Sequence, residues 1–233
     1  MTEQMPILLV PGATCSARLY AEQIPALWRF GPVMIADHTR DDTMAGIARR
    51  ILAAAPPRFV LIGLSMGGYI AFEMMRQAAA RVSKLALLDT SARADTPEQI
   101  ERRETHLRLA EGGKFSQVQA MQFPRMFHAS RHGDEALRRV FIEMAQDVGV
   151  EAFVRQQKAI MGRPNSVPGL AAIRCPTLVL VGDSDEITPP DCSVEIAEGI
   201  EGARLVTLKA CGHLSTLEQP AAVNRCLAAL LQA

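Results

Sequence analysis

The stretch FVLIGLSMGGYIAFEMM, residues 59–75, passes from an apolar run into a helical pattern through a serine flanked by glycines. Its first residues are apolar and partly β-branched, which is typical of a buried strand. From Tyr69 onward the pattern favours a helix. Gly63, Ser65 and Gly67 therefore stand at a strand-to-helix corner, where glycines let neighbouring backbones approach without Cβ clashes.

The corner matches G-x-S-x-G in the strand–turn–helix context that this motif requires, which predicts a nucleophilic serine. A serine at such a corner projects its hydroxyl above the sheet. The N-terminus of the following helix presents free N–H groups and a positive dipole end to a developing oxyanion. An incidental Gly/Ser turn is the alternative interpretation, and the flanking strand and helix patterns argue against it.

Short apolar runs alternate with helical patterns along most of the chain, which predicts an α/β fold with a parallel, doubly wound sheet covered by helices. The predicted strands are residues 6–10, 32–36, 59–63, 84–89, 177–182 and 203–208. The predicted helices between them are residues 16–30 (bent or broken at Pro25), 43–55, 66–80, 191–198 and 217–231.

Residues 91–173 break this alternation, because no strand pattern occurs there. We expect a helical insertion that caps a core made of residues 1–90 and 174–233. Its predicted helices are residues 97–111, 115–126, 134–147 and 150–161. Its apolar side chains, most of which we expect to pack helix against helix, include Leu107, Met121, Phe123, Met126, Phe127, Phe141, Met144 and Phe153.

A nucleophilic serine needs a base and an acid that orients the base. Of five histidines, only His213 lies just after the last predicted strand and before the terminal helix. The fifth strand ends in GDSD, which offers Asp183 and Asp185 at the sheet edge where catalytic groups gather. Asp89 also ends a strand and is a further candidate.

Taken together, GLSMGG, GDSD and CGHLSTLEQP, in this order, resemble the α/β-hydrolase superfamily over essentially the whole chain. The chain is most similar to the pimeloyl-[acyl-carrier protein] methyl ester carboxylesterases. The resemblance implies that Asp185, in the family's G-x-x-D segment, is the acid and that His213, in its GH pair, is the base. It also implies a trimmed sheet of about six strands, since few residues precede the first strand to form the family's N-terminal hairpin.

Two backbone N–H groups are expected to form the oxyanion hole. Met66 follows the nucleophile, and the second donor should come from the loop after the first strand. By resemblance that donor is Ala13. Family members usually carry His-Gly in this loop, whereas this chain has Pro11-Gly12. The departure removes a histidine that braces the loop, although a backbone donor does not itself need that side chain.

The insertion is predicted to roof the serine, because it leaves and re-enters the sheet at the edge where Ser65 projects. Pockets are mostly apolar, so some of its aromatic and methionine side chains should line the site. We expect Phe123, Phe127 and Met144 to supply part of the lining.

Composition excludes several other classes of function. Lys and Arg total 25 and Asp and Glu total 25, so no basic surface predicts nucleic-acid or membrane binding. Five scattered cysteines form no metal-binding or redox pair, and no signal peptide is evident, so we expect a cytoplasmic protein. Neither the residues nor the resemblance calls for a cofactor or metal, and the oligomeric state is left open.

The leading hypothesis is a serine hydrolase that cleaves a carboxylic ester of a small or medium acyl group through an acyl-enzyme. Another reaction on the same residues is the alternative: thioester or C–C hydrolysis, a lyase reaction or acyl transfer, since this fold hosts all of them. A ligand receptor without turnover is a third interpretation, against which the intact set of motifs argues.

Overall fold

The computed structural model describes residues 4–233 and contains one six-stranded sheet in the order β2-β1-β3-β4-β5-β6. Every neighbouring pair of strands is parallel. The strands are β1 (Ile7–Val10), β2 (Val33–Ile35), β3 (Phe59–Leu64), β4 (Val82–Leu88), β5 (Thr177–Gly182) and β6 (Arg204–Leu208). The predicted fold class is confirmed, and within residues 4–233 no strand precedes β1.

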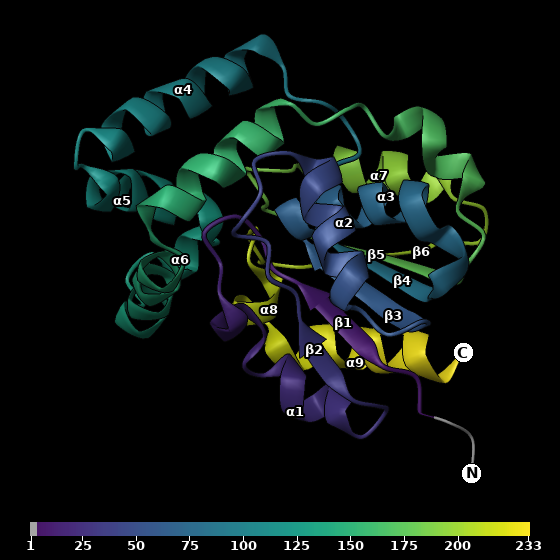
Figure 1. Cartoon of the computed structure of the whole chain (residues 1–233). Helices are drawn as coiled ribbons and strands as arrows, with labels where there is room; N and C mark the ends of the chain where they lie inside the picture. The colour runs from purple at the N-terminus through teal and green to yellow at the C-terminus, as the bar shows by residue number, and fades with distance from the viewer. Residues whose placement is uncertain (1–3) are drawn as a thin grey trace.

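Helices cover both faces of the sheet and also form the insertion (Figure 1). They are α1 (Gln23–Trp28), α2 (Met44–Ala54), α3 (Met66–Ala78), α4 (Pro97–Glu111), α5 (Phe115–Met126), α6 (Glu135–Met161), α7 (Pro190–Gly199), α8 (Ser215–Glu218) and α9 (Pro220–Gln232).

The side-chain alternation of β1 shows how the two faces are built. Leu8 and Val10 belong to a buried cluster with residues of α2, α3 and α7, whereas Ile7 and Leu9 belong to a second cluster with residues of α1 and α9. Strand residues point alternately to opposite faces, so a strand that is apolar throughout must be covered on both sides. The packing on both faces fixes the sheet, and with it the positions of the strand ends that carry the site.

The insertion between β4 and β5 consists of α4, α5 and α6 and lies over one side of the core (Figure 1). Two helices, residues 134–147 and 150–161, are predicted there, and the 27-residue element α6 consists of two helical segments at these places. Gly149 has φ 77° there, a conformation that favours glycine, and it kinks α6 between those two segments. The division into core and cap at residues 90/91 and 173/174 stays a prediction.

Two predicted helices are each divided into two shorter elements in the structure, and both contain a proline near the start of the second element. Residues 16–30 form a short 3₁₀ turn, Ala17–Tyr20, followed by α1, and Pro25 lies in the first turn of α1 instead of breaking it. A proline is tolerated there because the first N–H groups have no helical partner. Residues 217–231 are likewise divided, since Pro220 begins α9 just after α8.

Candidate active site

Ser65 lies at the corner between β3 and α3, with φ 55° and ψ −116°. Two backbone hydrogen bonds fix this strained residue: its N–H donates to Leu88 O at 3.0 Å, and its carbonyl accepts from Thr90 Oγ1 at 2.8 Å. A Cβ on Gly67 would lie 2.0 Å from Val10 O. Only glycine therefore fits beside the first strand, which explains why the corner needs its flanking glycines.

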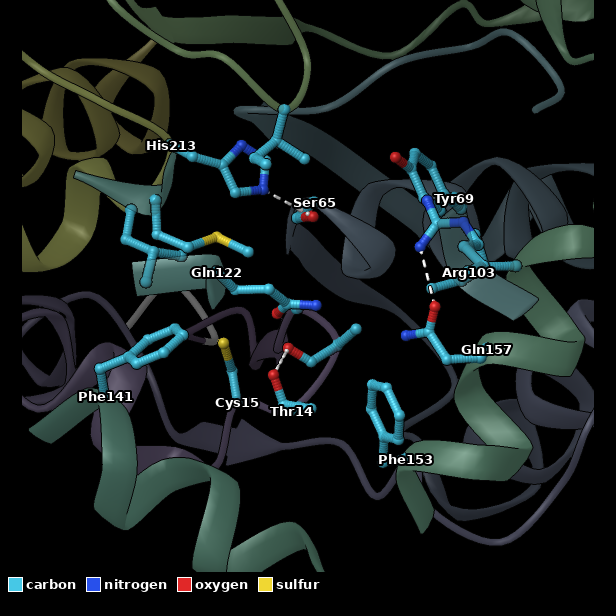
Figure 2. A pocket seen from close by; sticks show the side chains of 16 residues that line it. Thr14, Cys15, Ser65, Tyr69, Arg103, Gln122, Phe141, Phe153, Gln157 and His213 are labelled. Carbon is cyan, nitrogen blue, oxygen red and sulfur yellow. Dashed lines mark hydrogen bonds between the residues drawn. The ribbon is translucent and has the colours of Figure 1, made fainter. Parts of the chain in front are cut away.

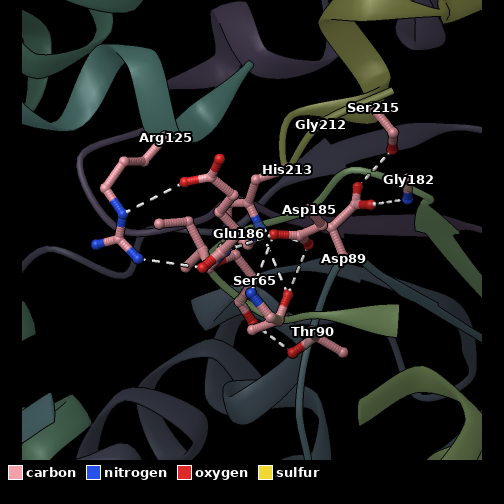
Figure 3. Close-up of polar contacts among 12 residues, drawn as sticks. Ser65, Asp89, Thr90, Arg125, Gly182, Asp185, Glu186, Gly212, His213 and Ser215 are labelled. Atoms are coloured by element: carbon pink, nitrogen blue, oxygen red, sulfur yellow. Dashed lines mark hydrogen bonds and ion pairs between the residues drawn. The ribbon is translucent and has the colours of Figure 1, made fainter. Parts of the chain in front are cut away.

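His213 reaches Ser65 from the loop between β6 and α8. Its Nε2 lies 2.9 Å from Ser65 Oγ, and its Nδ1 lies 2.8 Å from Asp185 Oδ2, so the three side chains form one hydrogen-bonded chain (Figure 3). Because Nδ1 faces a carboxylate, it carries the proton and leaves Nε2 to accept from the serine hydroxyl. The structure thus brings together the three predicted residues, which come from three different strand ends.

Asp185 is held by the turn that follows β5. Its Oδ1 accepts from Ile187 N at 2.8 Å and from Thr188 N at 3.0 Å, and Thr188 Oγ1 donates to its Oδ2 at 2.8 Å. Burial alone would raise the pKa of this carboxyl, but His213 and the Thr188 donors outweigh burial and hold the pKa below its usual value. Asp185 therefore stays ionised next to the imidazole.

Burial disfavours a charge on His213, but the Asp185 carboxylate outweighs burial and raises the pKa of the imidazole. His213 is fully enclosed, and its backbone N–H donates to Met126 O of α5 at 2.9 Å. A histidine whose charged form is stabilised by a fixed carboxylate can take a proton from a hydroxyl and return it later.

The other two candidate aspartates, Asp183 and Asp89, hydrogen-bond to groups other than His213. Asp183 accepts from Ser184 Oγ at 3.0 Å and from Cys211 N at 3.4 Å, so it joins the loops after β5 and β6 and does not contact His213. Asp89 has φ 44°, is fully buried, and accepts from Gly182 N at 3.0 Å and from Ser215 Oγ (Figure 3). Burial and the nearby Asp185 carboxylate raise the pKa of Asp89 to about 8.

The loop that carries Ala13 is braced by two side chains that sequence reasoning did not single out. His38, which follows β2, places Nε2 2.9 Å from Gly12 O, and Gln156 of α6 accepts from Thr14 N at 2.9 Å. The support lost with Pro11 is thus supplied by a histidine from another strand end. Burial lowers the pKa of His38, so the ring stays neutral and donates Nε2–H to the Gly12 carbonyl.

Ala13 and Ser65 both line a cavity of about 60 Å³ between the sheet edge and the insertion (Figure 2). Met66 is fully buried as the first residue of α3, directly after Ser65. The cavity has an apolar side and a polar side. The lining residues are Gly12, Ala13, Thr14, Cys15, Ser65, Tyr69, Arg103, Gln122, Met126, Phe141, Phe153, Gln157, Ile160, Ile187, His213 and Leu214.

The three cap residues expected to line the pocket are placed elsewhere. Phe123, Phe127 and Met144 are buried in the apolar cluster beneath the insertion and are not among the residues that line this cavity. Phe123 and Phe127 have ring centroids 4.9 Å apart and both pack against Phe141, which does reach the cavity. Phe141, from the same cluster, and Phe153, from a separate cluster with Ala110 and Val118, line the cavity instead.

The described part of the chain contains neither a metal-binding cluster nor a membrane-spanning helix. No group of three or more His, Cys, Asp or Glu side chains within residues 4–233 is arranged to hold a metal ion. Among the helices of these residues, none combines the length and the apolar character needed to cross a bilayer. The five cysteines are unpaired, and burial raises the pKa of the Cys15 thiol to about 12, so this neighbour of Ser65 stays protonated.

A family model described as the alpha/beta hydrolase family matches residues 7–225. The chain belongs to the alpha/beta hydrolase family. A thermophilic esterase from Thermogutta terrifontis, solved with malate bound, is a structural relative of this family member: identity is 28%, TM-score 0.89, and coverage 99% of this chain and 90% of that one.

Two other proteins are similar to this chain. The 2-hydroxy-6-oxononadienedioate/2-hydroxy-6-oxononatrienedioate hydrolase of Paraburkholderia xenovorans is 27% identical over 206 residues, which is 85% of this chain and 71% of that protein. The enol-lactonase from Burkholderia xenovorans LB400 has a TM-score of 0.90 at 23% identity, covering 99% of this chain and 92% of that one, and this likeness shows the fold alone.

Proposed function

We propose that this family member is a serine hydrolase that cleaves a carboxylic ester of a small or medium acyl group. The observation that carries the proposal is the continuous hydrogen-bonded chain from Ser65 through His213 to Asp185 beside a cavity. The modest cavity favours a small acyl group. The narrower likeness to pimeloyl-[acyl-carrier protein] methyl ester carboxylesterases stays a prediction.

In the proposed reaction Ser65 Oγ attacks the ester carbonyl while His213 Nε2 takes its proton. Asp185 keeps the proton of the neutral imidazole on Nδ1 and stabilises the imidazolium that forms. His213 then returns the proton to the leaving alcohol, and a water molecule attacks the acyl-enzyme by the same route. The N–H groups of Ala13 and Met66 would hold the oxyanion, and such a donor is worth about 2.7–4 kcal/mol in the transition state.

A C–C bond hydrolase is the second candidate. It is favoured by the similarity to the dienedioate/trienedioate hydrolase, whose name describes a substrate other than a simple ester. A serine–histidine–aspartate chain serves both reactions, so the fold cannot separate them. Turnover of a vinylogous diketone in preference to every ester of a matched panel would favour this alternative.

The decisive experiment treats the protein with a fluorophosphonate and maps the modified residue by mass spectrometry. We expect labelling at Ser65, and loss of labelling in Ser65→Ala together with a fall in kcat for p-nitrophenyl esters of about 10⁴ or more. Ser184→Ala is the matched control, because Ser184 is a nearby serine that bonds only Asp183 and the loop backbone. Unchanged labelling of Ser65→Ala would refute the proposal.

A further inference from the structure

The polar side of the cavity is built around a buried carboxylate that holds two arginines. Asp95 has no exposed side-chain surface, and its oxygens lie 2.7 Å from Arg103 Nε and 2.7 Å from Arg163 Nη1. Two guanidinium groups against one carboxylate leave an excess positive charge. Arg163 is almost completely buried, whereas the Arg103 side chain is 19% exposed and lines the cavity that holds Ser65.

Arg103 lines the cavity and keeps N–H donors that no described residue uses. Within residues 4–233, its hydrogen bonds go to Asp95, from Nε at 2.7 Å and Nη2 at 3.4 Å, and to Gln157 Oε1, from Nη1 at 3.0 Å. A guanidinium has five N–H donors, so two remain, one on each terminal nitrogen. Asp95 and Gln157 fix the fork in place, so little further entropy is lost when these donors bind a ligand.

Other donors converge on the same place. Tyr69 and Gln157 line the cavity next to Arg103 (Figure 2). Burial raises the pKa of the Tyr69 hydroxyl, which therefore stays a proton donor at neutral pH. The Gln157 carbonyl is used by Arg103, which leaves its amide group to donate. Phe141 lies across the cavity from Arg103, whereas Phe153 lies on the same side as Gln157 (Figure 2), and Met126 and Leu214 add further apolar lining.

The charges around this end of the cavity also favour an anion. Burial, followed by repulsion from Arg102, Arg103 and Arg125, lowers the pKa of His106, which contacts the pocket residue Gln122 at 3.2 Å. A site where neighbouring cations disfavour a protonated histidine has a positive potential, and a positive potential attracts an anionic group on a substrate.

We propose that the substrate carries a carboxylate, and that Arg103, with Tyr69 and Gln157, binds it while Ser65 attacks the ester carbonyl. This inference rests on the proposed function and deepens it: the preferred substrates are small esters with a free acid group, such as half-esters of short dicarboxylic acids. Arg103 presents paired N–H donors to the carboxylate, and the apolar side receives the methylene groups of the chain.

The test compares a charged ester with its uncharged isostere. 4-Nitrophenyl hydrogen glutarate ends in a carboxylate, and 4-nitrophenyl 5-methylhexanoate has an isopropyl group in its place. We expect wild type to favour the glutarate ester in kcat/KM. In Arg103→Gln the ratio of the two values should fall roughly 10- to 100-fold, the usual effect of losing a charged hydrogen-bond donor. Arg103→Lys keeps the charge but loses the planar pair of donors, so its ratio should lie between those of wild type and Arg103→Gln.

Arg108→Gln is the matched control, because Arg108 is on the same helix with its side chain 65% exposed. Its ratio should equal that of wild type. An unaltered ratio in Arg103→Gln, or no preference of wild type for the charged ester, overturns the inference while hydrolysis of the neutral ester still supports the proposed function. If neither ester is hydrolysed and Ser65 is not labelled, the proposed function itself fails.

A binding measurement gives a readout that does not depend on turnover. Glutarate should protect Ser65 from fluorophosphonate labelling in wild type, and 5-methylhexanoic acid amide, of similar shape and no charge, should protect less. We expect roughly 10- to 100-fold more glutarate to be needed for half-protection in Arg103→Gln. Equal protection of the two proteins by glutarate would contradict the assignment of Arg103. A melting curve of each variant shows whether it remains folded.

Discussion

The edge of the sheet and the helical insertion meet at the same cavity but are built in different ways. At the sheet edge, backbone geometry does the placing: Ser65 has a positive φ, and Gly67 leaves no room for a Cβ against β1. In the insertion, side chains do the placing, through an aromatic cluster and the arginines around Asp95. Met121 of α5 and Ile142 of α6 are substantially exposed, whereas the sheet edge has a continuous core beneath it.

The difference suggests a division of labour. Most side-chain substitutions leave the backbone in place. The distances between reacting groups that the backbone positions are therefore maintained. A wall made of side chains from α4, α5 and α6 can be altered one residue at a time. We therefore expect changes at the strand ends to alter the rate of bond cleavage, and changes in the insertion to alter the choice of substrate.

The largest expected effect is at Asp185, on the sheet side. Asp185→Asn should lower kcat by about 10⁴, because an amide no longer holds His213 in the required tautomer. Asp183→Asn is the matched control, since Asp183 joins two loops without contacting the histidine. Steady-state kinetics on a p-nitrophenyl ester gives both values. A severe loss in Asp183→Asn with an active Asp185→Asn would reverse the assignment.

An intermediate effect is expected in the insertion. Phe141→Ala enlarges the cavity beside Ser65, so the kcat/KM ratio between long and short p-nitrophenyl esters should rise by roughly 10- to 200-fold. Phe123→Ala removes a ring that packs against Phe141 without lining the cavity, and its profile should parallel that of wild type.

Both of these variants lose a buried ring, which costs about 3–5 kcal/mol in unfolding free energy, so melting curves should accompany the kinetics. Phe127→Ala and Met144→Ala complete the series. A changed preference in Phe123→Ala, with none in Phe141→Ala, would mean that Phe123 contacts the acyl chain, as predicted from the sequence, and that Phe141 does not.

The effect expected to be smallest for catalysis is one on stability, and it belongs to the sheet side. The pKa of Asp89 is about 8 in the folded protein, well above the value of about 3.9 in an unfolded chain. Its contribution to stability is therefore complete below pH 4 and is lost progressively as the pH rises through 8. Asp89→Asn escapes this loss, which is about 1.4 kcal/mol per pH unit. Its melting temperature should therefore gain on wild type by on the order of 10 °C between pH 5 and pH 8.5.

Asp183→Asn serves as the control for that titration. The pKa of Asp183 is lowered, because its donors outweigh the effect of burial, so its contribution persists at alkaline pH. Melting curves in a pH series for the three proteins provide the test. A constant difference between Asp89→Asn and wild type from pH 5 to pH 8.5 would mean that Asp89 is ionised throughout this range.

The sequence was informative where local pattern and position coincide. The strand runs and the G-x-S-x-G corner pointed to Ser65, and the loop after the last strand pointed to His213, because parallel strands bring their carboxyl ends to one edge. The end of β5 offered both Asp183 and Asp185, and the choice of Asp185 came from the family resemblance. His38 and Gln156 had no such signal. They act on residues 26 and 142 positions away in the chain, and no spacing rule joins them.

The helices of the insertion could be predicted from the sequence, but the side chains that they present to the cavity could not. Hydrophobicity marks Phe123 and Phe141 equally, and which of them faces the cavity depends on the rotation of α5 and α6 in the assembled cap. Arg103 had no distinguishing signal either, because it is one of several arginines in the insertion. Only the fold shows that Asp95 is buried and that Arg103 lines the cavity that also contains Ser65.

Hydrogen bonds couple the loop that carries Ala13 to the cap helix α6. The segment that carries Ala13 is fastened to α6, through Thr14 N–H to Gln156 and through Ser16 and Arg18 to Asp147. Outward movement of α6 has to break these bonds and free the loop. Under the proposed function, a movement of α6 that opens the cavity to substrate would therefore also displace Ala13, the proposed oxyanion donor. The reactive arrangement would then exist only while α6 encloses the substrate.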